Sequence, residues 1–191
     1  MTRILLAVIT GDFIRTQTVS TLLGLVKKVP EIDNFLIQQG PYIHENRENV
    51  VLFAQKGGYS HLFFVDWDMV FDPTVPLRLL DHDKDIVAAM YKVKVIPTRP
   101  VTLIEENGKP RQMTTEEVPQ EPFKCYATGA GCMLIKMSVF EKIERPWFSH
   151  KGINQIDGGE DVWFCEKARE AGFDVWVDPR IPIEHTGLFN Y

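Results

Sequence analysis

The chain has 191 residues, of which 45% are apolar and 25% charged, and its formal net charge is -5 at pH 7. This size and composition are typical of one compact α/β domain with a buried core. The acidic balance excludes a basic surface for nucleic acid. No apolar run reaches the roughly 18 residues that a membrane span requires. The three scattered cysteines, Cys125, Cys132 and Cys165, indicate neither a disulfide framework nor a zinc site, and favour a soluble protein of the reducing cytoplasm.

Strand and helix patterns alternate along the first 90 residues. Strands are predicted at Ile4–Ile9, Asn34–Gln39, Leu62–Val65 and Ile86–Met90. Helices are predicted at Ile14–Val29, at His44–Lys56 (ended by Gly57-Gly58) and at Pro73–Leu80. This alternation predicts an α/β fold with a doubly wound, mostly parallel sheet. We assign residues 1–90 to a nucleotide-binding half.

The remaining residues, 91–191, predict a smaller half with a mixed sheet. Its predicted strands are Tyr91–Leu103, Lys124–Ala127, Cys132–Lys136 and Val175–Val177, and its predicted helices are Ser138–Glu144 and Glu160–Ala171. Glu105–Pro122 is rich in Pro, Gly and Glu and is expected to be an exposed, mobile loop or hairpin. Pro179–Tyr191 is expected to be an irregular tail. Without repeats or a second core, residues 1–191 are expected to form one domain.

Two carboxylates follow the apolar strand Leu62–Val65, in the sequence Asp66-Trp67-Asp68. Ligands of open parallel sheets bind at this carboxyl edge of the strands. Residues two apart on an extended chain project to the same side, so Asp66 and Asp68 can converge on one hard divalent cation. The alternative is a polar turn in which both residues cap the following helix or face water.

Two further features lie near the C-terminus. Glu160 and Asp161 open a predicted helix after Gly158-Gly159, where the helix dipole favours ionised carboxylates. Ordinary helix capping would explain either residue alone. His185, in Glu184-His185-Thr186-Gly187, is either an ordinary histidine or a third metal ligand beside Asp66 and Asp68.

The ordered set resembles the GT-A glycosyltransferases, in particular family 2-like members with the Asp-x-Asp motif. The resemblance rests on Asp66-Trp67-Asp68, the Thr128–Ile135 segment with Gly129-Ala130-Gly131, Glu160-Asp161, and a later His185. His44–Asn49 also resembles the Arg-containing helix that precedes this motif. The short chain resembles either a catalytic module from a longer polypeptide or one of the minimal glycosyltransferases of phages and large viruses. The second alternative would place it in a host cytoplasm.

The resemblance implies a role for each matched residue. Asp68 and His185 would ligate Mn²⁺ or Mg²⁺ together with the donor diphosphate, and Asp66 would reach the ribose or the water shell of the metal. The nucleotide-sugar donor, with UDP the expected nucleotide, would contact the residues Thr10, Asp12, Arg47, Asp66, Trp67, Asp68, Gly129, Ala130 and Gly131. Asp161 would be the catalytic base, with Glu160 orienting a glycan or glycoprotein acceptor.

The resemblance therefore implies a metal-dependent hexosyltransferase, with residues 91–191 as its acceptor and catalytic half. A single base predicts inversion at the anomeric carbon, and retention stays open because GT-A folds host both outcomes. The segment after the first strand, Gly11–Arg15, lacks the Pro and Asn pattern of family 2, which leaves base recognition open. One alternative is a sugar-phosphate nucleotidylyltransferase, although Thr10–Phe13 replaces the Gly-, Arg- and Lys-containing loop of that class. The other is a non-catalytic module that binds a nucleotide sugar or carbohydrate.

Overall fold

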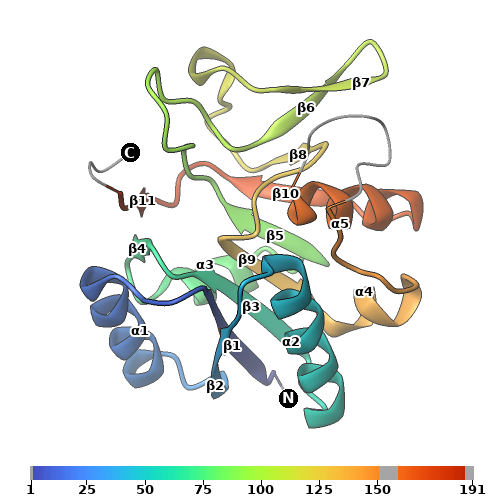
Figure 1. Ribbon diagram of the computed structural model, residues 1–191. Helices are drawn as coiled ribbons and strands as arrows, with labels where there is room; N and C mark the ends of the chain where they lie inside the picture. Colours follow the sequence, from blue (N-terminus) through green and yellow to red (C-terminus); the bar gives the residue numbers. More distant parts are fainter. Residues whose placement is uncertain (1, 151–158, 188–191) are drawn as a thin grey trace.

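A computed structural model describes residues 2–150 and 159–187, and its centre is a seven-stranded sheet in the order β2-β1-β3-β9-β5-β10-β8 (Figure 1). Strands β1, β2, β3, β5 and β10 run in one direction, and β8 and β9 run in the other. The strands are Ile4–Thr10 (β1), Ile32–Gln39 (β2), His61–Asp66 (β3), Ile86–Ala89 (β5), Phe123–Cys125 (β8), Cys132–Lys136 (β9) and Val175–Asp178 (β10). The prediction of a mostly parallel α/β sheet is confirmed.

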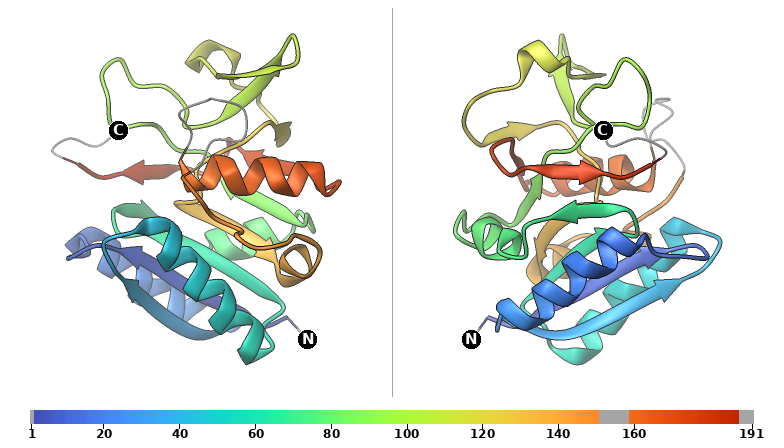
Figure 2. Two further views of the ribbon diagram at one scale, coloured as in Figure 1. Left: turned by 45° about the vertical axis from the view of Figure 1, so that its right-hand side comes forward. Right: turned by 90° about the vertical axis from the view of Figure 1, so that its left-hand side faces the viewer.

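Helices cover both faces of this sheet (Figures 1 and 2). Helices α1 and α3 pack on one face, and α2, α4 and α5 pack on the other. The helices are Thr16–Lys28 (α1), Ile43–Gly57 (α2), Val75–Leu80 (α3), Met137–Lys142 (α4) and Glu160–Glu170 (α5). Within the described parts of the chain, none of the helices has the length and apolar character of a membrane span.

The central strand β1 explains why the first apolar run is continuous rather than alternating. Leu5, Ala7 and Ile9 face α2, while the residues between them face α1, and every residue of the strand is buried. A strand with a hydrophobic layer on both sides has no face that needs polar residues.

The predicted irregular tail contains a strand. Ile183–His185 (β11) pairs antiparallel with Met69–Phe71 (β4), placing His185 opposite Met69. Each strand has three residues, too few for a period-2 pattern to be recognised in the sequence. This ladder joins the segment after Asp68 to the C-terminal part of the chain.

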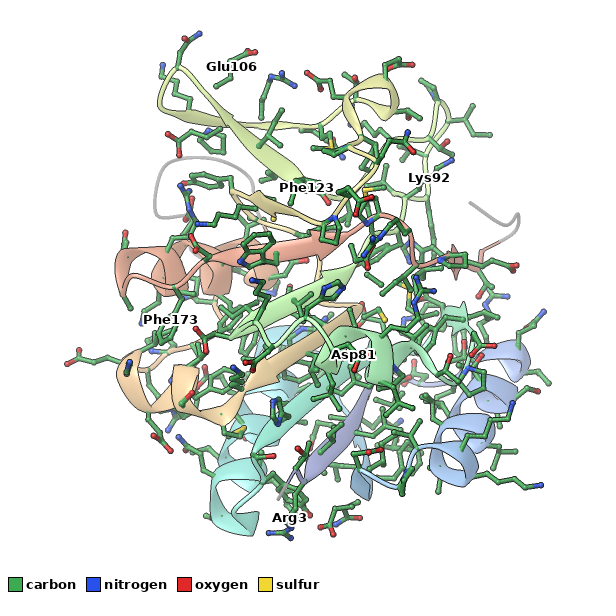
Figure 3. The ribbon with its side chains drawn as sticks, turned by 180° about the vertical axis from the view of Figure 1, so that it is seen from behind. Arg3, Asp81, Lys92, Glu106, Phe123 and Phe173 are labelled. Carbon is green, nitrogen blue, oxygen red and sulfur yellow. The ribbon has the colours of Figure 1, made fainter. Side chains whose placement is uncertain are left out.

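The first part of the segment Glu105–Pro122 belongs to a hairpin, which was one of its two predicted forms. Leu103–Glu106 (β6) pairs with Lys109–Gln112 (β7). The turn residues Asn107 and Gly108 have φ angles of 54° and 74°, as a type I′ turn requires. The labelled residues Glu106 and Arg3 lie at opposite ends of the molecule (Figure 3). A short 3₁₀ helix, Thr115–Glu117 (η1), follows the hairpin.

The predicted strand Tyr91–Leu103 is wrong over most of its length. Only one isolated bridge, between Lys92 and Pro100, precedes β6. Pro97 and Pro100 have no backbone N–H to donate to a sheet ladder, and Ile96-Pro97 is a cis peptide bond. The segment instead crosses as a loop from the end of β5 to the start of β6.

Candidate functional site

The Asp66-Trp67-Asp68 segment lies at the carboxyl end of β3 and is fixed by backbone hydrogen bonds. The Trp67 N–H donates to the Ile9 carbonyl at 3.2 Å. The Asp68 carbonyl accepts both the N–H and the hydroxyl of Thr186, at 2.9 and 2.8 Å. The motif is therefore held between the end of β1 and the residue that follows β11.

Asp68 and His185 face each other, with Oδ1 of the carboxylate 3.5 Å from Nε2 of the imidazole. The His185 Nδ1 lies 2.8 Å from the Lys92 carbonyl, to which it donates. Nε2 carries a lone pair toward Asp68 in the neutral ring and an N–H toward Asp68 in the protonated ring, and the protonated ring is the form that lowers the pKa of Asp68. Oδ1 of Asp68 is buried and has no hydrogen-bond partner among the described residues.

Lys94 forms an ion pair with the other carboxylate oxygen of Asp68, Oδ2. Burial raises the pKa of Asp68, but its interactions with His185 and Lys94 outweigh burial and hold the pKa below its ordinary value. Asp68 is therefore ionised at neutral pH.

Asp66 is turned toward Arg47, whose NH2 group donates to Oδ1 at 2.9 Å. In the parts of the chain that the structure describes, no three His, Cys, Asp or Glu side chains form a cluster able to hold a metal ion. The carboxylate of Asp68 and the imidazole of His185 remain as two donors facing each other. Oxygen and imidazole nitrogen donors suit Mn²⁺, and Asp68 has a buried oxygen without a hydrogen-bond partner, so the pair fits a cation completed by ligand oxygens.

Arg47 is only 1% exposed and links Asp66 to the start of α5. Its Nε donates to Glu160 at 3.0 Å, and its guanidinium lies 5.0 Å from the centre of the Phe64 ring. Burial lowers the pKa of Arg47, whereas Asp66 and Glu160 raise it by a larger amount. Burial also raises the pKa of Asp66, and Arg47 opposes that effect. Arg47 therefore lies inside the protein as the counter-charge of two acidic groups.

Asp161 lines a cavity of about 350 Å³ between the first turn of α5 and the β6–β7 hairpin. Its Oδ1 accepts the N–H of Val162 at 2.8 Å. Burial and the adjacent charge of Glu160 raise the pKa of Asp161 to about 7, against the lowering effect of Arg47. Burial and Glu160 therefore oppose the effect of the helix dipole on Asp161. Gly158 lies outside the described residues.

Glycines line the same cavity. A Cβ atom on Gly159 would lie 2.8 Å from Oδ1 of Asp161, and one on Gly129 would lie 2.0 Å from the hydroxyl of Tyr91. The neighbouring Ala130 is fully buried, and its carbonyl accepts from Arg47 at 3.5 Å. The small residues thus leave room for Asp161 and Tyr91.

Tyr91 is a site residue that the sequence analysis missed. Its hydroxyl accepts the N–H of Gly131 at 3.2 Å, and its ring packs edge-on against His185 at 5.1 Å. A Cβ on Gly131 would be 2.9 Å from both this hydroxyl and Oδ2 of Asp66, so the two groups approach Gly131 closely from the same side. The position of Tyr91 just after the strand Ile86–Met90 was the signal available. Nothing in the sequence marked Lys94.

A smaller cavity of about 120 Å³ lies at the end of β1 and includes Thr10, Gly11 and Trp67 in its lining. Phe13 packs edge-on against the Trp67 ring at 4.7 Å, and Arg15 lies 5.5 Å from that ring. Asp12 is exposed in the adjoining turn. The aromatic ring of Trp67 in this lining suits a planar heterocycle.

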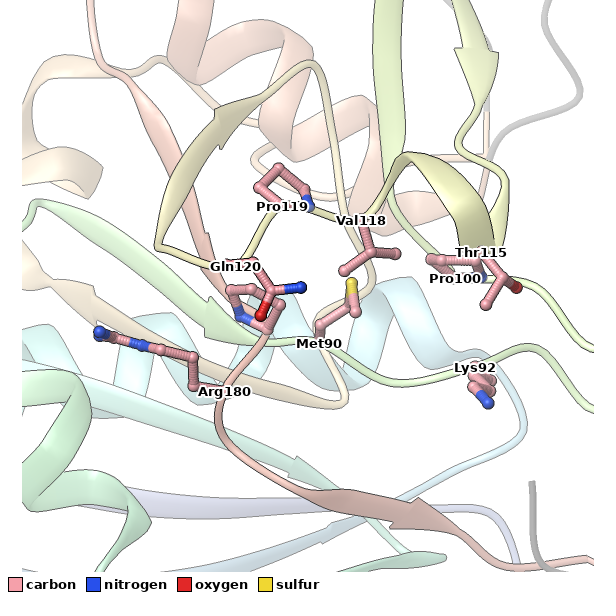
Figure 4. Close-up of a pocket in the computed structure, with 9 residues that line it drawn as sticks. Met90, Lys92, Pro100, Thr115, Val118, Pro119, Gln120 and Arg180 are labelled. Carbon is pink, nitrogen blue, oxygen red and sulfur yellow. The ribbon is translucent and has the colours of Figure 1, made fainter.

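A third cavity, of about 380 Å³, is surrounded by residues that include Met90, Lys92, Val118, Gln120 and Arg180 (Figure 4). It shares no lining residue with the cavity beside Asp161, and none of the predicted site residues lines it.

Comparisons with known proteins give structural neighbours only. No family model and no curated protein matches the sequence. The structure is similar to A197 from STIV, with a TM-score of 0.70 and 19% identity over 97% of this chain and 86% of that one. It is also similar to GalNAc-T7 crystallised with UDP, GalNAc and Mn²⁺, with a TM-score of 0.54 and 12% identity over 97% of this chain and 44% of that one. The TarS 1-349 structure from S. aureus gives a TM-score of 0.52 and 13% identity over 96% of this chain and 59% of that one.

The fold is that of the GT-A glycosyltransferases. At these identities the likeness concerns the fold alone. The chain spans about half of the length of GalNAc-T7 and TarS 1-349, so neither protein's activity transfers to it directly.

Proposed function

We propose that the protein is a metal-dependent glycosyltransferase that moves a sugar from a nucleotide-sugar donor, UDP-linked in our expectation, to an acceptor hydroxyl with inversion. The observation that carries the proposal is the pair Asp68 and His185, which face each other at 3.5 Å beside a buried carboxylate oxygen without a hydrogen-bond partner. In a GT-A fold this pair lies at the carboxyl edge of the sheet, where nucleotide ligands bind.

The donor would lie along this edge. Asp68 and His185 would hold Mn²⁺ or Mg²⁺ together with diphosphate oxygens, and Asp66 would reach the ribose or the water shell. A divalent cation bound there supplies Lewis-acid stabilisation of the departing diphosphate. Thr10, Asp12 and Trp67 would surround the base in the 120 Å³ cavity that Thr10 and Trp67 line.

Asp161 is the proposed general base, because it lines the 350 Å³ cavity and its pKa of about 7 suits proton abstraction near neutral pH. Attack by a hydroxyl from the face opposite the leaving group inverts the anomeric carbon. Glu160 is 6% exposed and bound to Arg47, which favours a positioning role for both over direct contact with acceptor or nucleotide. Arg47 would orient Asp66 and Glu160 at the same time.

The acceptor, a glycan or glycoprotein, would enter between α5 and the β6–β7 hairpin. The hairpin contributes Leu103, Pro110, Arg111 and Gln112 to the cavity beside Asp161. Gly129, which lines the same cavity, would let the backbone approach the donor sugar. Because β9 lies between β3 and β5, the two halves of the chain share one sheet, which favours a single catalytic domain.

Titration calorimetry with UDP, with and without Mn²⁺, followed by a donor-hydrolysis assay over a panel of nucleotide sugars, tests the proposal. We expect Mn²⁺-dependent UDP binding and release of UDP from at least one donor. Binding without turnover of any donor would favour a binding module. Pyrophosphate release from a nucleoside triphosphate and a sugar phosphate would favour a nucleotidylyltransferase.

A further inference from the structure

The two oxygens of Asp68 have different surroundings. Oδ1 faces His185 Nε2 at 3.5 Å, and Oδ2 is paired with the ammonium of Lys94. The Lys94 ammonium also lies 5.0 Å from the centre of the Trp67 ring. A cation over an indole face gains electrostatic stabilisation, so Trp67 helps to hold Lys94 against Asp68.

Lys94 lies on a loop that can release it without disturbing the core. The loop is closed by hydrogen bonds from the Val93 N–H to the Arg99 carbonyl, at 3.0 Å, and by the bridge between Lys92 and Pro100. Ile96, at the tip of the loop, is already 80% exposed, so a movement of the tip changes the buried apolar surface little. The Lys94 side chain is itself 27% exposed.

The same loop reaches the second candidate ligand of the metal. The carbonyl of Lys92, two residues before Lys94, accepts the bond from His185 Nδ1. One short segment thus orients the imidazole and supplies a cation to the facing carboxylate. A divalent cation between Asp68 and His185 would meet the Lys94 ammonium at the same carboxylate, where like charges repel.

We propose that Lys94 and the divalent cation compete for Asp68, and that the Lys94 ammonium transfers to the donor diphosphate when cation and nucleotide enter together. The inference rests on the proposed function, because it assumes a metal at Asp68 and His185. A divalent cation neutralises only part of the charge of a nucleoside diphosphate, so the displaced ammonium finds a partner there. Lys94 then makes metal and nucleotide binding cooperative.

Titration of the full chain with Mn²⁺, in the presence and in the absence of UDP, tests the competition. The loss of the electron paramagnetic resonance signal of free Mn²⁺ measures binding. In Lys94→Met we expect Mn²⁺ alone to bind about tenfold more tightly than in the wild type. The factor by which UDP tightens Mn²⁺ binding should fall by about the same amount, within the 5–150-fold range of ordinary coupling. By reciprocity, calorimetry should show the same reduction in the effect of Mn²⁺ on UDP affinity.

Lys84→Met is the matched control, because the Lys84 ammonium lies 4.3 Å from the Trp176 ring in a comparable contact. It should leave both affinities at the wild-type value. If Lys94→Met does not fold, Lys94→Gln removes the same charge and carries the same expectation.

The possible results distinguish the role of Lys94 from the assignment of the metal site. Equal Mn²⁺ affinity and equal UDP coupling in wild type and Lys94→Met would overturn the role of Lys94 and leave the metal assignment standing. Failure of both proteins to bind Mn²⁺, even with UDP, would overturn the metal assignment and this inference with it.

Discussion

Asp68 and His185 face each other at 3.5 Å because Asp68 directly precedes β4, His185 is the last residue of β11, and these two three-residue strands pair with each other. The main chain reinforces the pairing, since the Asp68 carbonyl accepts two hydrogen bonds from Thr186. The distance between the two side chains is therefore set by a ladder, and neither needs to move far to meet a common ligand.

Replacing His185 or Asp68 should weaken metal-dependent donor binding. We expect His185→Ala and Asp68→Ala each to lower UDP affinity in Mn²⁺ by at least about 10–100-fold, because losing a ligand costs no less than losing a residue that only orients one, for which this range is found. Excess EDTA should lower wild-type affinity similarly, and Mn²⁺ should act at least as well as Mg²⁺. His82→Ala is the control, because His82 forms an equivalent pair with Asp178 at 2.9 Å outside the site. Equal wild-type affinity in EDTA, measured by calorimetry, would contradict the metal assignment.

Replacing Arg47 should destabilise the fold. Arg47→Met leaves Asp66 and Glu160 without their shared cation, and breaking a buried pair costs about 3–5 kcal/mol. Arg169→Met removes an exposed pair with Glu105 and should cost about 0–1 kcal/mol. Urea unfolding of both variants gives the comparison. Equal unfolding free energies would mean that Arg47 is not a structural counter-charge.

The sequence predicted the sheet well because both of its faces are covered. Long apolar runs such as Ile4–Ile9 identify buried strands whatever their neighbours, and these runs account for the strands β1 and β3. The acidic residues at the end of β3 followed from the same argument, because ligand sites of parallel sheets lie at that edge.

The pairings across the site could not be predicted. Strand β11 has three residues and exists only because β4 lies beside it. The contact of Lys94 with Asp68 depends on a loop whose course is fixed by Pro97 and Pro100 rather than by any periodic pattern. The burial of Arg47 could not be predicted either, because it is decided by tertiary packing.

The β6–β7 hairpin is expected to be protected by ligand. A Glu-specific protease should cut at Glu105 or Glu106, beside the exposed turn, and more slowly when UDP-sugar and Mn²⁺ are present. The physical reason is that the hairpin lines the cavity in which the donor sugar and acceptor would lie. Cleavage at Glu144, in the exposed segment after α4, serves as the internal control. Mass spectrometry measures the cleavage rates at both positions. Equal rates at the hairpin with and without ligand would show that the hairpin does not close over the site.

Asp161→Asn should separate chemistry from binding. The amide keeps the shape of the side chain but cannot accept a proton, so turnover should fall by about 10²–10⁴-fold while UDP affinity stays within about twofold. In the wild type, turnover should rise as pH increases through about 7, because the raised pKa of Asp161 delays ionisation. NMR of the product should show an inverted anomeric carbon. Near wild-type turnover in the variant, or retention of configuration, would refute the assigned role.

The same substitution should make the protein more stable, in a pH-dependent way. Burial and Glu160 raise the pKa of Asp161 from 3.8 to about 7, so between these values the folded state binds more protons than the unfolded state. The wild type therefore loses stability as pH rises through this window, whereas Asp161→Asn has no proton to lose. The variant should gain about 0.5–2 kcal/mol at pH 8, as is common when a strained functional group is removed, and less at pH 5. Urea unfolding at both pH values measures the gain, with the exposed Asp174→Asn as control. An equal gain in stability at pH 5 and pH 8 would mean that the charge of Asp161 does not destabilise the folded state.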